Sequence, residues 1–450
     1  MKEPKGNMYY FGILFLLGLV ALPFGSVGPI FQWVWVIYIG VFCLIVLLDL
    51  LLRKRNYRHG AKPANSAMLV ALLLVFWSII QNTDLAIALF FLPLTTPSSS
   101  LATGAISVNV FKSTGSSLFL LSHVVFFFLV VNFCKEKRQA ILIIKSIAII
   151  ISLYSIYGLI VYFSGNDTVL WFQKSSSKVA LSSTFVNRNN FATYGGIGLI
   201  ALLAWSAGTF GSIDQSRQFS VQIRQFSTKF LGGGGYLILL CFIVGTSILL
   251  TGSRAGISST IVGSVGIIAF GAARPRNFSA SFSFKTVIFF ISILALFWLS
   301  GALFVDRFYI FEYRSIERFD LYSTVITAIL AEPFLGYGLG TFEEVIRVFR
   351  PLNVDLYFVR AHNEYLEILA GLGIFGFVVM LYISLYLVHA QFQSFKKAVK
   401  SRPFIAASIA IITLVALHSL VDFPLQIPAI SYTFTAILGA GTSLANRRKI

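Results

Sequence analysis

Charged side chains are scarce in this sequence. They make up 12% of its 450 residues, whereas hydrophobic residues make up 57%, and a soluble domain carries roughly 25% charged residues. Three cysteines occur in or beside apolar runs, too few and too scattered for a disulfide framework or a cysteine metal site; they are Cys43, Cys134 and Cys241. The composition predicts an integral membrane protein whose cysteines are packing residues.

Motifs that hold divalent cations are also missing. The chain contains no Asp-x-Asp and no His-x-x-x-His, and loop 83–117 holds no acidic pair. A metal ion that bridges a sugar pyrophosphate would need such oxygen ligands. We therefore expect no metal and no cofactor. If the substrate is a pyrophosphate, arginine side chains must neutralise it.

Long apolar runs are abundant. A helix needs about 20 apolar residues to cross a membrane. Twelve such segments occur, near 8–25, 29–52, 66–82, 117–134, 140–163, 190–208, 234–250, 255–272, 286–305, 365–389, 403–421 and 427–445. No small-residue cleavage site follows the first, so we expect an uncleaved span rather than a signal peptide. The sequence predicts an all-α, polytopic membrane protein of about 12 transmembrane helices, with plain linkers such as 209–233.

Basic residues give the orientation. The net charge is +18. With these spans the Lys and Arg clusters all fall on one side, together with both termini; the clusters lie at 53–62, 135–138, 217–229, 274–285, 396–402 and 447–449. An excess of Lys and Arg marks the cytoplasmic side, which explains the charge without nucleic acid as a partner. Loops 306–364 and 164–189 and the turn 251–254 then face outward.

The long outward segment 306–371 has arginine as its sole type of cation. Its arginines are Arg307, Arg314, Arg318, Arg347, Arg350 and Arg360, and it holds no lysine. The planar fork of arginine grips phosphate or carboxylate bidentately. Acidic residues are present as well, so the segment is either an anion site or a loop held by Arg–acid pairs.

Two more arginines lie where predicted spans reach the outward-facing surface of the membrane. Arg254 occupies the short turn Thr251–Gly256 between two apolar runs, and Arg188 precedes the span near 190–208. An arginine at such a boundary is costly unless it reaches lipid phosphates or faces a partner. Both are candidates for anion contact, with snorkelling to lipid as the alternative for Arg254.

His362 lies where a span begins after the long segment. We expect Asn363 to cap that helix, and His362 and Tyr365 to share one helical face at its outer mouth. A capping or hydrogen-bonding histidine is the alternative, and the nearby Arg360 favours function. His418 and Asp422, spaced i and i+4 before a proline, predict a buried pair that orients a loop.

Glycines at alternate positions follow Glu332-Pro333, where the helix after Arg318 is expected to stop. They are Gly336, Gly338 and Gly340. Such a run suits either a turn whose amides face a ligand or a compact corner, and the sequence leaves both open.

Five motifs, in this order, resemble the bacterial O-antigen ligase and polymerase superfamily. They are TGSRAG, ERFDLY, EPFLGYGLGTF, RAHNEYLEILAGLGIFG and ALHSLVDFPLQIP. The resemblance covers roughly residues 180–445. It divides the chain into N-terminal transmembrane helices, 1–180, and an O-antigen ligase-like catalytic membrane region, 181–450, which includes the loop 306–364. The family usually has tryptophan two residues after the arginine of ERFDLY, and this chain has Asp320 there.

The resemblance implies a GT-C-like glycosyltransferase of the bacterial inner membrane, with both termini cytoplasmic and its site facing the periplasm. The donor would be a glycan on undecaprenyl pyrophosphate, the acceptor lipid A–core or a glycan, and membrane lipids would surround the protein. By similarity Arg254 and Arg318 would bind the pyrophosphate, and His362 would act near the acceptor hydroxyl, without a metal. We add the hypothesis of a direct, inverting displacement at the anomeric carbon, in which Arg254 and Arg318 clamp the pyrophosphate, Arg360 or Arg188 assists and His362 is the base. The predicted substrate contacts are Arg360, Arg188 and Tyr365.

Several functions remain open at this level. A ligase moves a finished glycan onto lipid A–core, whereas a polymerase joins lipid-linked repeat units, and the motifs are shared. The single, compact histidine-bearing loop favours the ligase. A protein-O-glycosylating relative is a third possibility. A transporter of an anionic lipid-linked substrate predicts charged or broken helices near mid-membrane, whereas the polar groups here gather at one outer face.

Overall fold

The computed structural model describes residues 6–52, 62–84, 104–165, 167–174, 179–210, 218–272, 320–350 and 358–445. These residues are mostly helical, with a single two-stranded antiparallel hairpin. The first half comprises α1 (Gly6–Leu19), η1 (Phe24–Ser26), α2 (Pro29–Leu52), α3 (Lys62–Ile80), α6 (Val110–Phe133), α7 (Lys137–Phe163), β1 (Thr168–Val169), β2 (Phe172–Gln173) and α8 (Arg188–Phe210). The second comprises α9 (Phe219–Lys229), η2 (Phe230–Gly234), α10 (Gly235–Leu250), α11 (Arg254–Ala272), α14 (Phe342–Phe349), α15 (Glu364–Phe395), α16 (Arg402–His418), η3 (Pro424–Gln426) and α17 (Pro428–Ala445).

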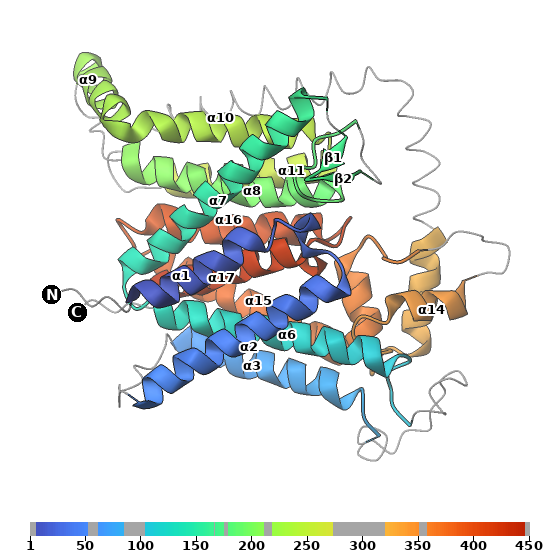
Figure 1. The fold of residues 1–450 in the computed structure, drawn as a ribbon. Helices are drawn as coiled ribbons and strands as arrows, with labels where there is room; N and C mark the ends of the chain where they lie inside the picture. The colour runs from blue at the N-terminus through green and yellow to red at the C-terminus, as the bar shows by residue number, and fades with distance from the viewer. Residues whose placement is uncertain are drawn as a thin grey trace.

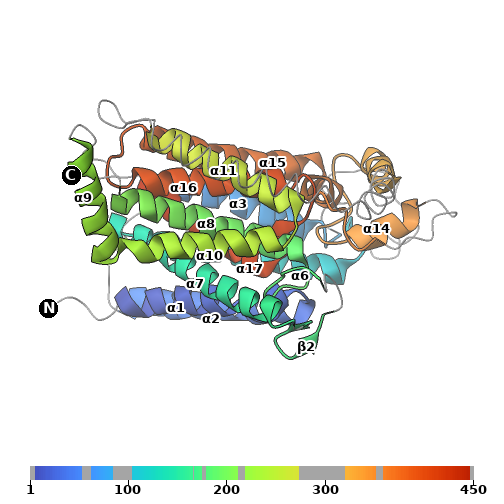
Figure 2. The same cartoon turned by 90° about the horizontal axis from the view of Figure 1, so that it is seen from above.

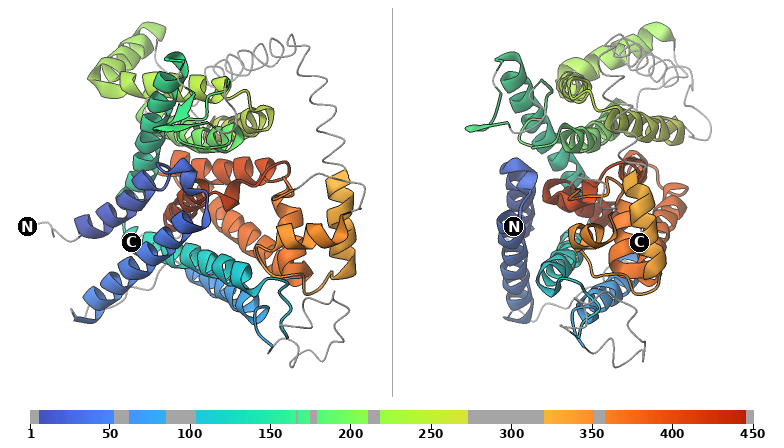
Figure 3. Two further views of the ribbon diagram at one scale, coloured as in Figure 1. Left: turned by 45° about the vertical axis from the view of Figure 1, so that its right-hand side comes forward. Right: turned by 90° about the vertical axis from the view of Figure 1, so that its right-hand side faces the viewer.

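The helices form an elongated bundle (Figures 1 and 2). α16 and α17 lie between two groups, with α7, α8, α10 and α11 on one side and α1, α2, α3 and α6 on the other (Figures 1 and 3). α17 is buried along nearly its whole length, and its small residues let neighbours approach closely. A Cβ on Gly439, for example, would lie 2.8 Å from a methyl group of Val130 on α6.

The described helices agree with the predicted spans. Eleven of the twelve predicted segments coincide with helices, and the segment 286–305 lies outside the described residues. Among the residues described, seven helices are long and apolar enough to cross a membrane: Pro29–Leu52, Pro63–Ile80, Val110–Phe133, Lys137–Phe163, Arg188–Phe210, Ser220–Leu250 and Glu364–Phe395. Met8–Leu19, Asp320–Ala331 and Arg402–His418 are shorter apolar helices. The all-α membrane class is therefore supported, and the number twelve stays a prediction.

The two ends of the bundle differ. α1 begins at the end where α9 lies, whereas α14 lies at the opposite end (Figure 2). The prediction of a plain linker over 209–233 was wrong, because Phe219–Lys229 forms the helix α9. A π-turn at η2, with Gly233 at φ +102°, joins α9 to α10.

The alternating glycines form a compact corner against a break in α15. Gly373 interrupts that helix with φ +67°, which releases carbonyl groups that an unbroken helix would use itself. The amides of Tyr337 and Gly338 donate to the carbonyls of Ala370 and Gly371, each at 2.9 Å. These two amides are therefore occupied by protein rather than by a ligand.

Side chains from other helices complete the corner. The amide of Gln81 donates to the carbonyls of Leu335 at 2.6 Å and Gly371 at 3.0 Å, and the Trp77 indole donates to the Leu372 carbonyl at 3.0 Å. Burial raises the pKa of Tyr337 to about 12. Its hydroxyl therefore stays protonated and donates to the Ala328 carbonyl at 2.9 Å. The hydrogen bonds described above join the glycine run to both α3 and α15.

Replacing Gly336 with alanine is expected to lower the melting temperature in detergent. Gly336 has φ +69°, and an added Cβ would lie 2.5 Å from the Gly373 nitrogen. Strain of about 1–3 kcal/mol is typical of an L-residue held in that region, and the backbone on the other side cannot yield. Gly245→Ala is the matched control, because nothing lies within 4 Å of a Cβ built there. An unchanged melting temperature for Gly336→Ala would contradict the corner as described.

Candidate active site

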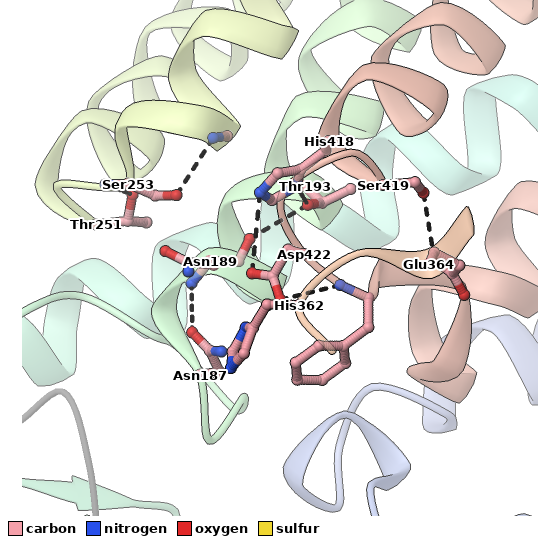
Figure 4. Close-up of polar contacts among 12 residues, drawn as sticks. Asn187, Asn189, Thr193, Thr251, Ser253, His362, Glu364, His418, Ser419 and Asp422 are labelled. Atoms are coloured by element: carbon pink, nitrogen blue, oxygen red, sulfur yellow. Dashed lines mark hydrogen bonds and ion pairs between the residues drawn. The ribbon is translucent and has the colours of Figure 1, made fainter. Parts of the chain in front are cut away.

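Polar side chains gather where five elements meet. The first residues of α8, α11 and α15 lie there with the last turn of α16 and the segment that leads into η3 (Figure 4). This is the end of the bundle opposite the start of α1 (Figure 2). It is also the end to which the predicted outward motifs were assigned.

His362 stands just outside helix α15. The helix begins at Glu364, and the side chain of Asn363 accepts the Leu366 amide at 3.2 Å, so the predicted cap is confirmed. His362 itself has φ +51°, a left-handed conformation for a non-glycine residue. The prediction that it shares a helical face with Tyr365 was therefore wrong.

The backbone of His362 is tied to another part of the long segment. The hydroxyl of Tyr322, on the helix Asp320–Ala331, donates to the His362 carbonyl at 3.1 Å. The imidazole ring of His362 packs edge-on against Phe423, with 5.1 Å between centroids, and the His362 side chain is 29% exposed. The imidazole is thus fixed in place and still open to an incoming molecule.

Asp422 is the nearest ionisable partner of His362. Its Oδ1 lies 3.4 Å from Nδ1 of His362 and accepts the Phe423 amide at 3.0 Å. Its side chain is 1% exposed. A carboxylate in contact with one imidazole nitrogen fixes the ring and favours a proton on that nitrogen.

The environment keeps Asp422 ionised. Burial by itself raises the pKa of Asp422, but contacts with His362 and His418 outweigh it and hold the pKa below its ordinary value of 3.8. Because the folded-state pKa is the lower one, ionised Asp422 stabilises the fold above its unfolded pKa. That contribution is lost as the pH falls through the lowered value.

The predicted pair of His418 and Asp422 is buried, but it is not isolated. Nε2 of His418 lies 4.0 Å from Oδ2 of Asp422, on the side away from His362 (Figure 4). Nδ1 of His418 forms a hydrogen bond with the hydroxyl of Thr193 on α8. The sequence spacing predicted the pair, but the link through Asp422 to His362 could not be seen without the fold.

Two buried glutamates at the start of α15 hold the segment that carries Asp422. Glu364 accepts hydrogen bonds from the Ser419 hydroxyl at 3.3 Å and the Leu425 amide at 3.0 Å. Glu367 accepts from the Ala361 amide and the Gln426 side chain, each at 2.6 Å. The sequence analysis gave neither glutamate a role. Two acidic residues in the first turn of an apolar helix were the available signal.

Two of the predicted arginines are the first residues of two neighbouring helices. Arg254 is the first residue of α11 and is exposed, and Arg188 is the first residue of α8 and is half-buried. α8 and α11 pack so closely that a Cβ on Gly256 would lie 2.5 Å from that of Ala192. Helix N-termini favour anions through their free amides and the helix dipole. Both arginines therefore add positive charge where the backbone already favours an anion.

The remaining predicted site residues divide into three cases. Nη1 of Arg360 lies 3.6 Å from Oε2 of Glu367, and its side chain is 34% exposed. Tyr365 donates its hydroxyl to the Ala416 carbonyl at 2.8 Å, so it also ties α15 to α16. Arg318 lies outside the described residues. Contact of all three with substrate stays a prediction.

Among the residues that the structure describes, no three His, Cys, Asp or Glu side chains gather in a way that could hold a metal ion. The chemical groups found at this end are the His362 imidazole, the buried Asp422 carboxylate and the arginines that begin α8 and α11. They can accept a proton and stabilise negative charge. The fold defines a multi-helix protein of the all-α membrane class, and these groups make one end of its bundle the candidate site.

Comparison with known families agrees with this class. Residues 239–381 match the family model described as O-antigen ligase. The matched stretch contains Arg254, Arg360, His362 and Tyr365, whereas Arg188 and Asp422 lie outside it. No curated protein matches the chain. The match confirms the resemblance to the O-antigen ligase and polymerase superfamily and supports an activity of that type on lipid-linked glycans.

Proposed function

We propose that this protein transfers a glycan from undecaprenyl pyrophosphate to an acceptor hydroxyl at the periplasmic face of the bacterial inner membrane. The acceptor we propose is lipid A–core, which makes the enzyme a ligase. One observation carries the proposal: His362 contacts the buried Asp422 carboxyl group at the end of the bundle where the arginine-bearing helices α8 and α11 begin.

The proposed reaction is a direct displacement at the anomeric carbon, with inversion. The acceptor oxygen forms the new bond to that carbon, and the electron pair of the breaking C–O bond goes to the pyrophosphate. The proton of the acceptor hydroxyl goes to His362. Because Nδ1 of His362 faces Asp422, Nε2 is the nitrogen available to take the proton. General base catalysis of this kind is typically worth about 10²- to 10⁴-fold.

The arginines act on the leaving group. Negative charge grows on the pyrophosphate as the bond breaks, and preorganised cations in a water-poor site stabilise that charge. Arg254 and Arg318 are the proposed clamp, with Arg188 and Arg360 assisting. No step of this scheme requires a metal ion, so we propose a metal-independent transfer.

The first experiment uses purified protein and undecaprenyl-pyrophosphate-linked glycan, with and without EDTA. Lipid A–core and a second lipid-linked repeat unit are offered separately, and His362→Ala serves as the inactive control. We expect product on lipid A–core that EDTA does not reduce. A ladder of longer lipid-linked chains would make the protein a polymerase instead. Binding without transfer to either acceptor would favour a transporter.

A further inference from the structure

The buried histidine His418 has no part in the proposed reaction, yet it faces the carboxylate that does. Its side chain is 1% exposed, and its two ring nitrogens face different partners. Nδ1 contacts the Thr193 hydroxyl, and Nε2 points to Oδ2 of Asp422 at 4.0 Å. Asp422 thus lies between two imidazoles, one buried and one open to substrate (Figure 4).

The proton arrangement on His418 follows from its partners. An unprotonated Nε2 would place a lone pair against an ionised carboxylate, which is unfavourable. Nε2 therefore carries a proton. The Thr193 hydroxyl can donate to Nδ1 of a neutral ring. When it donates instead to the Asn189 carbonyl at 3.2 Å, it can accept from Nδ1 of an imidazolium. In both arrangements His418 directs an N–H toward Asp422.

We propose that His418 is a positioning residue that acts through Asp422 to set how readily His362 binds a proton. The N–H of His418 draws on the negative charge of Asp422, so less of that charge acts on His362. Nε2 of His418 faces Oδ2 from 4.0 Å, beyond hydrogen-bond distance, so its effect on the carboxylate is electrostatic, while Oδ1 faces His362 and the Phe423 amide. This inference rests on the proposed role of His362 as the base.

Other ionisable groups near this end of α16 are engaged elsewhere or lie on neighbouring helices. Glu364 on α15 faces Ser419 and the Leu425 amide. Also on α15, Tyr365 donates its hydroxyl to the Ala416 carbonyl of α16 at 2.8 Å, and Glu367 accepts from the Gln426 side chain at 2.6 Å. On the other helices packed against α16, the ionisable groups toward this end include Arg188 and Tyr194 on α8, Arg254 on α11 and Tyr432 on α17. The Tyr432 hydroxyl bonds to Ser122 on α6 at 2.7 Å. Within the described part of the chain, Asp422 is the carboxylate found within 4.0 Å of a ring nitrogen of His418.

The test measures the proton affinity of His362 without relying on activity. Diethyl pyrocarbonate modifies neutral imidazole, so the extent of His362 modification is followed against pH by mass spectrometry of its peptide. With His418→Leu, the charge of Asp422 acts more fully on His362, and the midpoint should rise by about half to one pH unit. With His418→Gln, whose amide can donate to Asp422, the midpoint should return toward that of the wild type.

A second variant keeps the test valid if His418→Leu does not fold. Thr193→Val preserves side-chain shape and removes the hydroxyl that orients His418, so it should shift the midpoint in the same direction by a smaller amount. Thr435→Val is the control, because the hydroxyl of that buried threonine on α17 bonds to the Ser431 carbonyl of its own helix at 2.8 Å.

The outcomes separate this inference from the proposed function. Midpoints that stay at the wild-type value in folded His418→Leu and Thr193→Val would overturn the role of His418, even if glycan transfer is observed. A shifted midpoint in a protein that transfers no glycan would keep the link between the two histidines and refute the proposed reaction.

Discussion

Replacing His362 with alanine is expected to lower the rate of glycan transfer by about 10²- to 10⁴-fold, the range of general base catalysis. The loss should appear in kcat, because the imidazole takes the proton only as the new bond forms. The purified variant should still fold, with a modest fall in melting temperature, because the His362 side chain is 29% exposed but contacts the buried Asp422 carboxylate and the Phe423 ring.

His389→Ala is the matched control for this prediction. His389 lies on the same helix, α15, but is exposed near its other end, where its closest polar partner is Gln393 at 3.5 Å. Its loss should leave transfer unchanged. Full activity of a folded His362→Ala protein would exclude His362 as the base, whatever the acceptor proves to be.

Arg254→Ala is expected to reduce transfer by about 10²- to 10³-fold, the usual cost of removing one preorganised group that stabilises transition-state charge. The residue opens α11 in a turn held by its own side chains: Thr251 accepts the Ser253 amide at 3.1 Å, and Ser253 accepts the Gly256 amide at 3.3 Å. Because these contacts do not involve the guanidinium, the turn should survive its removal.

Arg254→Lys tests the type of contact. Lysine keeps the charge but lacks the planar fork, so it should restore part of the lost rate if the partner is a pyrophosphate. Arg224→Ala on α9, an exposed arginine at the opposite end of the bundle, is the control and should retain full activity. Equal transfer rates for wild type and Arg254→Ala would contradict a role in transfer and would favour the alternative that Arg254 reaches lipid phosphates.

Most of the helices could be predicted from the sequence, because apolar runs of span length have few other folded states in a membrane. The helix start after Asn363 was also predictable, since an asparagine cap acts locally. The left-handed conformation of His362 was not, because it depends on the Tyr322 contact to its carbonyl from another part of the chain.

The same distinction holds for the site. The residues Arg254, Arg188 and His362 could be singled out by type and position, since each interrupts or borders an apolar run. Asp422 was expected to partner His418, four residues away on the chain. Its contact with His362, which lies 60 residues earlier in the chain, depends on how α15 and α16 pack. The role of the glycine run was likewise undecided until the amides of Tyr337 and Gly338 were seen to bond α15.

The dependence of the start of α15 on the segment after α16 has a consequence for biogenesis. Synthesis proceeds from the N-terminus, so α8, α11 and α15 enter the membrane before Ser419, Leu425 and Gln426 leave the ribosome. Until then Glu364 lacks the Ser419 and Leu425 donors, Glu367 lacks the Gln426 side chain, and His362 lacks Asp422. A nascent or truncated chain would therefore carry its arginines without the His362–Asp422 contact, and we expect the proposed activity to appear only when α16 and the segment after it are in place.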